Sequence, residues 1–203
     1  TLPLITKSDG TKFGKTESGT IWLDSAKTSP YAFYQFWLQS ADSDVYRFLR
    51  YFTFLPVEQI EQIEKDDAER QGRPDAQRVL AEEVTRLVHG EEGLVAAKRI
   101  TDALFSGDTS ALSEQDYAQL ALDGLPSSSI DVTAVSELPL TTILSDAGMA
   151  SNGKQVKDAL QRNAVIVNGR ASGMDDNMNA ANVFSIDGAL FGKYFLVKLG
   201  KKK

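Results

Sequence analysis

Apolar residues recur at every third or fourth position over most of residues 29–124, which places them on one face of a helix. Ser29 before Pro30 is a typical helix start, and a glycine such as Gly90 is typical of a helix end. The pattern predicts six helices, which begin at Pro30, Asp42, Pro56, Asp75, Glu91 and Ser113. Ahead of them, residues 1–6 are expected to form a strand, which a glycine-rich loop follows.

The pattern changes near residue 124, where Ser and Pro become frequent, and we expect a linker over residues 126–136. Two short helices are expected after it, one over residues 138–148 and one that Ser151 caps. Three strands are then predicted, at residues 164–167, 183–188 and 194–199. An Asn-Gly turn follows the first of them and favours a hairpin. The fold class expected is mainly α, with a small α+β C-terminal domain.

The composition limits the kinds of partner. The 203 residues include no cysteine, which excludes disulfides and thiolate metal sites and fits a cytoplasmic protein. No apolar run approaches the ~20 residues that span a bilayer, so no membrane partner is expected. The net charge of −6 is uneven: residues 1–136 carry 13 Lys and Arg against 22 Asp and Glu, and residues 137–203 carry 9 against 6. A polyanion is therefore expected to meet the second part.

The loop before the first helix carries candidate chemistry. Two lysines, Lys12 and Lys15, flank a Phe-Gly pair, and Thr16 follows. Compact ammonium groups on a mobile loop suit a polyphosphate, and they can stabilise a departing pyrophosphate. The loop is not a Walker A motif, because Asp9 stands where that motif needs glycine. On residue types alone, a solvated surface turn is the alternative.

Residues 12–16, Lys-Phe-Gly-Lys-Thr, resemble the KMSKS signature of class I aminoacyl-tRNA synthetases, in the variant typical of bacterial tyrosine–tRNA ligases. Further blocks resemble that family in the same order and extend the likeness to about residue 125. These blocks lie at residues 3–6, 21–24, 27–31, 34–37, 87–94 and 97–101. The resemblance implies that Lys15 holds the triphosphate of ATP and that Lys12 assists as pyrophosphate leaves. It also places Gly14 and Thr16 in the ATP-binding loop.

The same resemblance implies an enzyme that activates tyrosine with ATP, accompanied by Mg²⁺, and transfers it to tyrosine tRNA. A full ligase of this family also has an α/β domain with a His-x-Gly-His signature and a tyrosine pocket. This sequence contains neither, and no metal ligands are identifiable. Its one histidine, His89, is expected to support a helix dipole. We therefore expect a C-terminal part that is inactive and monomeric alone, whereas the intact enzyme dimerises through the missing domain.

Three parts follow from this interpretation. Residues 1–26 would be the tail of the catalytic domain, residues 27–125 a helical anticodon-binding bundle, and residues 137–203 a second RNA-binding domain. The last part resembles the small RNA-binding module named after ribosomal small-subunit protein S-four. Candidate RNA contacts in it are Ser151, Lys154, Gln155, Lys157, Arg162 and Lys198. Asn152 stands where that module usually has an arginine, and a solvated face remains the alternative. The tail 201–203 is either a phosphate contact or a disordered end.

Two further features have alternatives. In this family the helical domain approaches the anticodon stem-loop, so Asp42 and Asp44 are candidates for reading the anticodon, with N-capping as the alternative. Ten of the 18 aromatic residues lie between Tyr31 and Phe54, where helical spacing favours a packed core over a base-stacking surface. For the whole chain, the alternative is a free-standing RNA-binding protein in which the lysine loop is an inert turn.

Overall fold

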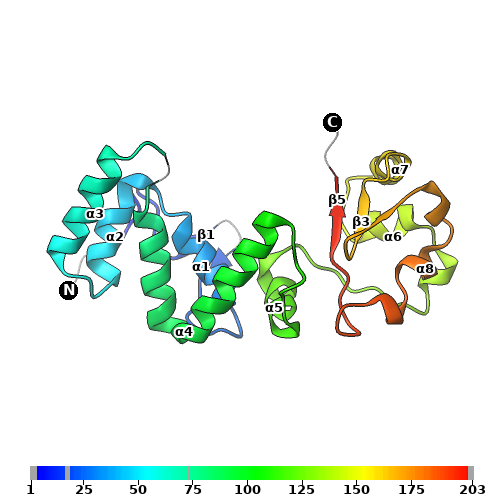
Figure 1. Ribbon diagram of the computed structural model, residues 1–203, viewed down its shortest axis with the longest axis horizontal. Helices are drawn as coiled ribbons and strands as arrows, with labels where there is room; N and C mark the ends of the chain where they lie inside the picture. The colour runs from blue at the N-terminus through cyan, green and yellow to red at the C-terminus, as the bar shows by residue number, and fades with distance from the viewer. Residues whose placement is uncertain (1–3, 17–18, 73, 201–203) are drawn as a thin grey trace. The chain divides into compact units, whose positions relative to one another are not determined.

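The computed structural model describes residues 4–16, 19–72 and 74–200. The chain divides into two compact units, Thr1–Leu125 and Pro126–Lys203, which are described separately below (Figure 1). Within the described ranges, no helix is long and apolar enough to cross a membrane.

The first unit is helical, and five of the six predicted helix starts are confirmed to within one residue; the exception is Glu91. Its helices are α1 Pro30–Leu38, α2 Asp42–Phe52, α3 Val57–Glu69, α4 Ala76–Ser106 and α5 Glu114–Gln119, which continues as a π-helical turn over Leu120–Gly124. The Ser29 hydroxyl accepts a hydrogen bond from the Ala32 amide at 3.1 Å, which caps α1. Ser113 and Asp116 cap α5 reciprocally. Local signals therefore set these ends.

Helix α4 is bent in the middle, at Gly90. Two helices were predicted here, and the structure joins them with a break in the helical dihedrals, where Gly90 has φ 72° and ψ −179°. Its two halves turn away from one another in Figure 1. The bend is braced by ion pairs across it, Arg86 to Glu91 and Lys98 to Glu82, both at 2.8 Å. Glycine is suited to this position because L side chains rarely adopt a positive φ.

His89 lies at the same bend. Its ring meets Phe33 edge-on, with 4.8 Å between ring centroids, and it is half-buried. Burial lowers the pKa of His89, which favours the neutral ring at pH 7. A neutral imidazole gives the helix dipole little support, so packing, and not the charge role that we expected, accounts for this histidine.

Gly93 is the second glycine that the bend requires. A Cβ at this position would lie 2.6 Å from the Cβ of His89, a contact that no rotamer change can relieve. We expect Gly93→Ala to lower the free energy of unfolding by about 1–3 kcal/mol through overpacking. Thermal unfolding followed by circular dichroism would measure it. Gly153→Ala is the control, because its nearest atoms lie 3.8 Å away. Equal losses in both variants would contradict the clash.

The core of the first unit contains most of the aromatic run, so the packed-core prediction is confirmed. Phe33, Tyr34, Trp37 and Phe48 are each less than 5% exposed. They pack with apolar residues of α2, α3 and α4, among them Val45, Leu49, Ile60, Leu80, Val84 and Leu94. Phe54, which is 89% exposed, stays outside this core.

The segment before α1 differs from the prediction. Of the expected strand, residues 1–3 lie outside the described part, and Leu4 and Ile5 are not in a strand. Thr6 forms an isolated bridge with Lys12 instead. Two short antiparallel strands follow, β1 Lys15–Thr16 and β2 Gly19–Thr20. The loop is therefore folded back on itself.

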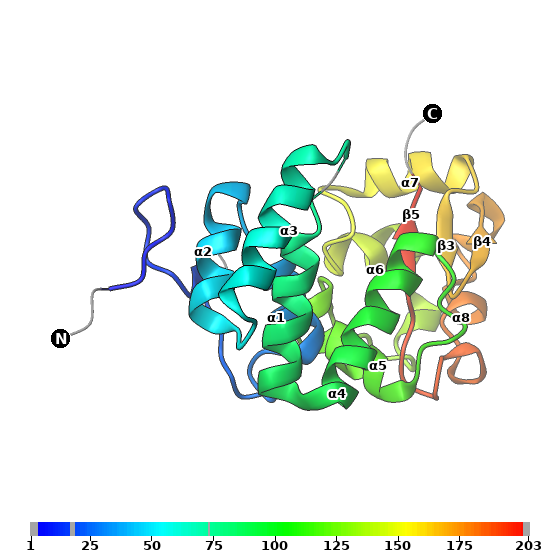
Figure 2. The ribbon, with the colours of Figure 1, turned by 60° about the vertical axis from the view of Figure 1, so that its left-hand side comes forward.

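The second unit contains helices on a small sheet. Helices α6 Leu140–Asp146, α7 Gly153–Gln161 and α8 Ala180–Val183 accompany strands β3 Val165–Val167, β4 Arg170–Ser172 and β5 Val197–Leu199. The antiparallel order is β4-β3-β5 (Figure 2). Asn168 and Gly169 have φ 48° and 81°, as a tight hairpin turn requires, which confirms that prediction. Short 3-10 turns lie at Val135–Glu137, Met174–Asp176 and Ile186–Gly188.

Several predictions for this unit are wrong. Residues 183–188 are not a strand, because Ala180 and Phe184 are buried at helical spacing and Ser185 accepts a bond from the Gly188 amide that closes a 3-10 turn. The last strand begins at Val197, three residues later than expected. The expected linker 126–136 contributes Ile130 and Val135 to the unit's core.

Candidate functional site

The lysine loop is the segment that carries Lys12 and Lys15, before α1. Hydrogen bonds within residues 5–13 order its first part. The Lys7 amide donates to the Thr11 carbonyl at 2.8 Å, and the Phe13 amide donates to the Ile5 carbonyl at 3.2 Å. Asp9 accepts bonds from the amide and hydroxyl of Thr11, at 2.8 and 2.6 Å. These bonds, the hydroxyl bond first, lower the pKa of Asp9. The turn before Lys12 is therefore held by its own polar groups.

Phe13 attaches this loop to the helices. Its ring centroid lies 4.8 to 5.6 Å from those of four aromatic side chains on α1 and α2, which are Phe36, Trp37, Phe48 and Phe52. Edge-on and offset pairs at such distances are favourable beyond the area they bury. Phe13, between the two lysines, is thus packed against the helical unit, while Lys12 directly before it is exposed.

A polar contact holds the loop at a second point. The Ser8 amide donates to both oxygens of Asp44 at 3.0 Å, and the Ser8 hydroxyl donates to Oδ2 at 3.1 Å. Arg47 forms an ion pair with Asp44 and donates to the Thr6 carbonyl at 2.8 Å. Asp44 is only 1% exposed. A buried carboxylate with both oxygens in use is not free to meet a base edge, which disfavours Asp44 as a candidate for reading the anticodon.

Of the predicted phosphate residues, Lys12 lies between these two contacts, and Gly14, Lys15 and Thr16 follow Phe13. Lys12 is exposed, and no ion pair is found for it among the described residues. Gly14 has φ 81° and an open surrounding, since a Cβ there would meet nothing within 4 Å. The backbone of Lys15 and Thr16 forms β1, but their side chains lie outside the described part. A free ammonium beside an open glycine fits an anionic oxygen.

Asp42 has a different environment from Asp44. It is exposed, and it accepts a bond from Gln77 Nε2 at 2.6 Å. The residue at the N-cap of α2 is Ala41, without a side-chain cap, so neither aspartate caps this helix as the alternative supposed. In the described ranges, no group of three or more His, Cys, Asp or Glu could hold a metal ion.

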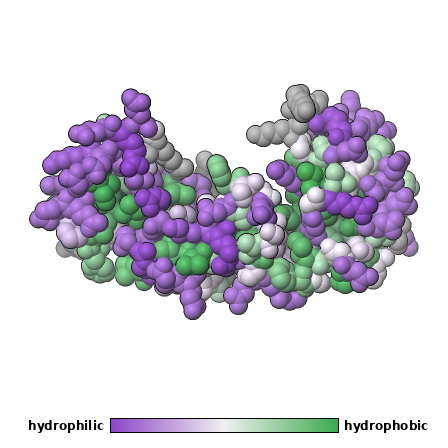
Figure 3. Space-filling model, viewed as in Figure 1, coloured by the Kyte–Doolittle hydropathy of each residue, from purple (hydrophilic) through white to green (hydrophobic). Residues whose placement is uncertain are grey.

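The candidate RNA contacts of the second unit gather on α7. Lys154 and Lys157 are exposed and three positions apart, so they are neighbours on the helix. Figure 3 shows hydrophilic residues over this part of the second unit. Asn152, not Ser151 as expected, caps α7 by accepting from the Gln155 amide at 3.1 Å. The Gln155 side chain in turn accepts a hydrogen bond from the Ser151 amide. Ser151 and Gln155 therefore both stabilise the N-terminal end of α7.

Arg162 lies at the C-terminal end of α7, and Lys198 lies on β5. The Arg162 guanidinium binds the Asp158 carboxylate at 3.2 Å. Lys198 is paired with Ile166 in the sheet register, and its strand neighbours Val197 and Leu199 pack on the core. Because side chains alternate along a strand, Lys198 lies on the outer face of the sheet. The core face packs against α7, so the structure does not bring Lys198 together with the α7 lysines.

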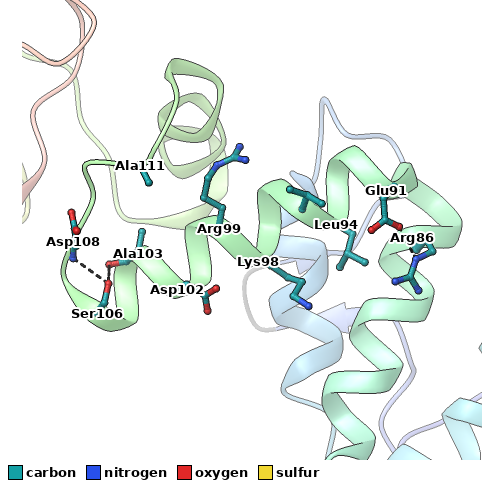
Figure 4. Close-up of a pocket in the computed structure, with 11 residues that line it drawn as sticks. Arg86, Glu91, Leu94, Lys98, Arg99, Asp102, Ala103, Ser106, Asp108 and Ala111 are labelled. Atoms are coloured by element: carbon teal, nitrogen blue, oxygen red, sulfur yellow. Dashed lines mark hydrogen bonds and ion pairs between the residues drawn. The ribbon is translucent and has the colours of Figure 1, made fainter.

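The first unit also has an open groove that the sequence pattern did not indicate. Figure 4 shows it along α4 from Arg86 onward and along the segment that follows to Ala111, and its volume is about 570 Å³. Its charged lining is mostly engaged: Arg86 with Glu91, Lys98 with Glu82, and Arg99 with Asp116 through two bonds of 2.8 Å. Most of the charged side chains that line the groove are therefore engaged in ion pairs that stabilise the first unit. These pairs join residues 5, 16 and 17 positions apart, so no local sequence pattern indicated the groove.

A family model described as tRNA synthetases class I (W and Y) matches residues 1–106, which is more than half of the chain. The chain therefore belongs to this family.

Curated relatives narrow the likeness. The chain is 58% identical over 202 residues to a tyrosine–tRNA ligase of Aliivibrio fischeri (strain MJ11), covering 100% of this chain and 46% of that protein. It is 52% identical to tyrosine–tRNA ligase 1 of Vibrio parahaemolyticus serotype O3:K6, with coverages of 100% and 45%. A solved C-terminally truncated mitochondrial tyrosyl-tRNA synthetase of Aspergillus nidulans is 37% identical over 42% of this chain and 25% of that chain, with TM-score 0.40. The chain spans less than half the length of these curated relatives.

Proposed function

We propose that this chain supplies the ATP-contacting lysine loop and the tRNA-binding surfaces of a tyrosine–tRNA ligase. The observation that carries the proposal is the Lys-Phe-Gly-Lys-Thr loop, placed with an exposed Lys12 on a chain that resembles tyrosine–tRNA ligases along its whole length. The intact ligase activates tyrosine with ATP and transfers it to tyrosine tRNA.

In this proposal, the loop acts on the triphosphate. Lys15 holds it, and Lys12 stabilises the negative charge that grows on pyrophosphate as it leaves. Gly14 allows the backbone to approach the phosphates, and Thr16 follows in the same loop. Magnesium would come bound to ATP and supply further charge neutralisation. Fixed positive charge aimed at a developing anion is commonly the largest electrostatic contribution to catalysis.

The two units would bind tRNA in different ways. The helical unit would approach the anticodon stem-loop, and of the two aspartates only the exposed Asp42 remains a candidate for a base contact. The second unit would act as an S-four-like module, with α7 and its lysines against RNA phosphates. Residues 137–203 carry more Lys and Arg than Asp and Glu, and this positive balance suits binding of a polyanion.

Alone, the chain should bind tRNA without activating tyrosine. It contains no His-x-Gly-His signature, and the tyrosine pocket would lie in the part of the relatives that it does not cover. The intact ligase would dimerise through that part, leaving this chain monomeric alone. A free-standing RNA-binding protein is the alternative, in which substitutions in the lysine loop would change no reaction.

The test of the binding surface is a salt series. Binding of tyrosine tRNA should weaken as salt rises, and each phosphate-contacting lysine that is removed should reduce the log–log slope by about 0.7–0.9. We expect Lys154→Ala/Lys157→Ala to bind tyrosine tRNA more weakly. Its log–log slope should be smaller by about twice that amount. Lys65→Ala, on α3, removes a charge elsewhere and serves as the control. A double variant with unchanged affinity and slope would remove α7 from the RNA site.

A further inference from the structure

Asp44 is an expensive residue to bury unless its charge is compensated. A desolvated carboxylate without partners is strongly unfavourable, and the bonds it accepts must offset that cost. Here the bonds come from two sources: Arg47 on the same helix, and Ser8 on the lysine loop through both its amide and its hydroxyl. Ser8 donates three hydrogen bonds to this carboxylate, and Arg47 donates one. The environment of Asp44 therefore depends on the position of the loop.

Arg47 depends on the loop as well. Its guanidinium binds Asp44 and also donates to the Thr6 carbonyl, two residues before Ser8. If the loop left α2, the pair would lose its partners in the loop at once. The buried Asp44 and the partly exposed Arg47 have these partners only when the loop is docked, so the pair gives the loop a defined position on α2, beside the apolar contact of Phe13.

The two contacts stand on either side of Lys12. Ser8 lies four residues before it and Phe13 directly after it, so both the entry to the loop and its exit are fixed to the helical unit. The exposed ammonium of Lys12, which lies between the two contacts, is thereby restricted to a smaller range of positions. Catalytic groups gain from such fixing, because small displacements of a charge cost rate.

We propose that Asp44, supported by Arg47, is a positioning residue that holds the lysine loop in the conformation that presents Lys12 to the triphosphate. This inference rests on the proposed function of the loop. It goes beyond it by assigning loop placement to a carboxylate of the helical unit, which we had considered as an anticodon contact.

The chain offers a matched control. Asp66 on α3 also accepts a side-chain bond, but from Gln62 of the same helix and not from the loop. Asp44→Asn and Asp66→Asn therefore remove the same charge from the helical unit. Ser8→Ala supplies a second variant, because it removes the hydroxyl bond from an exposed loop residue and leaves the helix intact.

The experiment uses the intact ligase and two readouts. Hydrogen exchange, measured by mass spectrometry, follows the Ser8 amide, and single-turnover kinetics follow tyrosyl-adenylate formation. Loss of a hydrogen bond to a charged group changes an equilibrium by about 10- to 100-fold. We expect Asp44→Asn to speed exchange at Ser8 by about tenfold and to slow adenylate formation by a similar factor, with the KM for tyrosine unchanged. Ser8→Ala should give a smaller change in both, and Asp66→Asn in neither.

Each outcome decides a different point. Faster exchange at Ser8 with an unchanged rate would show that docking is irrelevant to the reaction and would overturn the proposal. Unchanged exchange would overturn it too, because Asp44 would not hold the loop. Absence of tyrosine-dependent activity in the unsubstituted ligase would instead reject the proposed function, and the positioning role with it. The exchange data would still report the docking.

Discussion

Lys15→Ala in the intact ligase is expected to slow tyrosyl-adenylate formation by about 10²–10³-fold, the loss that follows removal of one group that stabilises transition-state charge. The expectation rests on the proposed role of Lys15 in the Lys-Phe-Gly-Lys-Thr loop. Because the effect lies in the chemical step, the rate constant at saturating ATP should fall, not only the affinity for ATP. Single-turnover formation of the adenylate measures this directly.

Lys7→Ala is the control for that experiment. It removes the same charge from the same loop, outside the residues that resemble the signature. Its rate should stay within a few-fold of the unsubstituted enzyme, since surface charges act weakly over a distance in salt. If both variants were equally slow, general loop charge would explain the result, and an unchanged Lys15→Ala rate would remove the loop from the mechanism.

Asp116→Asn should destabilise the first unit by about 3 kcal/mol, the lower end of the loss when one partner of a buried ion pair is removed. The side chain of Asp116 is fully buried, and it binds Arg99 through two bonds of 2.8 Å. It also accepts the Ser113 amide at 2.8 Å, which caps α5. Arg99 is partly exposed, which is why the lower end applies. Denaturant unfolding followed by tryptophan fluorescence measures it, since both tryptophans lie in this unit.

The same carboxylate gives the effect a pH signature. Burial acts to raise the pKa of Asp116, but the bonds from Arg99 and Ser113 outweigh burial and lower it. A carboxylate with a lowered folded pKa stabilises the fold above its unfolded pKa of about 3.9, and this contribution is lost as the pH falls through the folded pKa. Asp116→Asn should therefore be less acid-sensitive below pH 4. Asp102→Asn is the control, because Asp102 is exposed in the groove along α4. This variant should keep the full acid sensitivity of the unsubstituted protein.

Helix starts in the first unit were predictable because their determinants are local. Ser29 with Pro30, and Ser113 with Asp116, are signals only a few residues long, and both operate as expected. The strand predicted for residues 183–188 was wrong because its determinants are not local. The apolar residues there fit a strand and a helix equally well. Burial of Ala180 and Phe184 at helical spacing in the second unit decides between the two.

The site shows the same limit. The Lys-Phe-Gly-Lys-Thr loop and the α7 lysines could be proposed as sites from local sequence alone. The role of Asp44 could not, because its partner Ser8 is 36 positions away and the local signal, an aspartate in the first turn of a helix, favours capping. The packing of Phe13 onto α1 and α2 is equally non-local. Pattern reasoning places residues on elements, but it does not join elements that are distant in sequence.

The apolar seat of Phe13 has a consequence for temperature. Contacts made by burying aromatic surface weaken on cooling, whereas the charge-assisted bonds of Ser8 with Asp44 do not share that hydrophobic temperature dependence. In the cold, the exit side of the loop should therefore loosen before the entry side. The loop would then pivot about Ser8, and Lys15, beyond the loosened aromatic ring, would gain more freedom than Lys7.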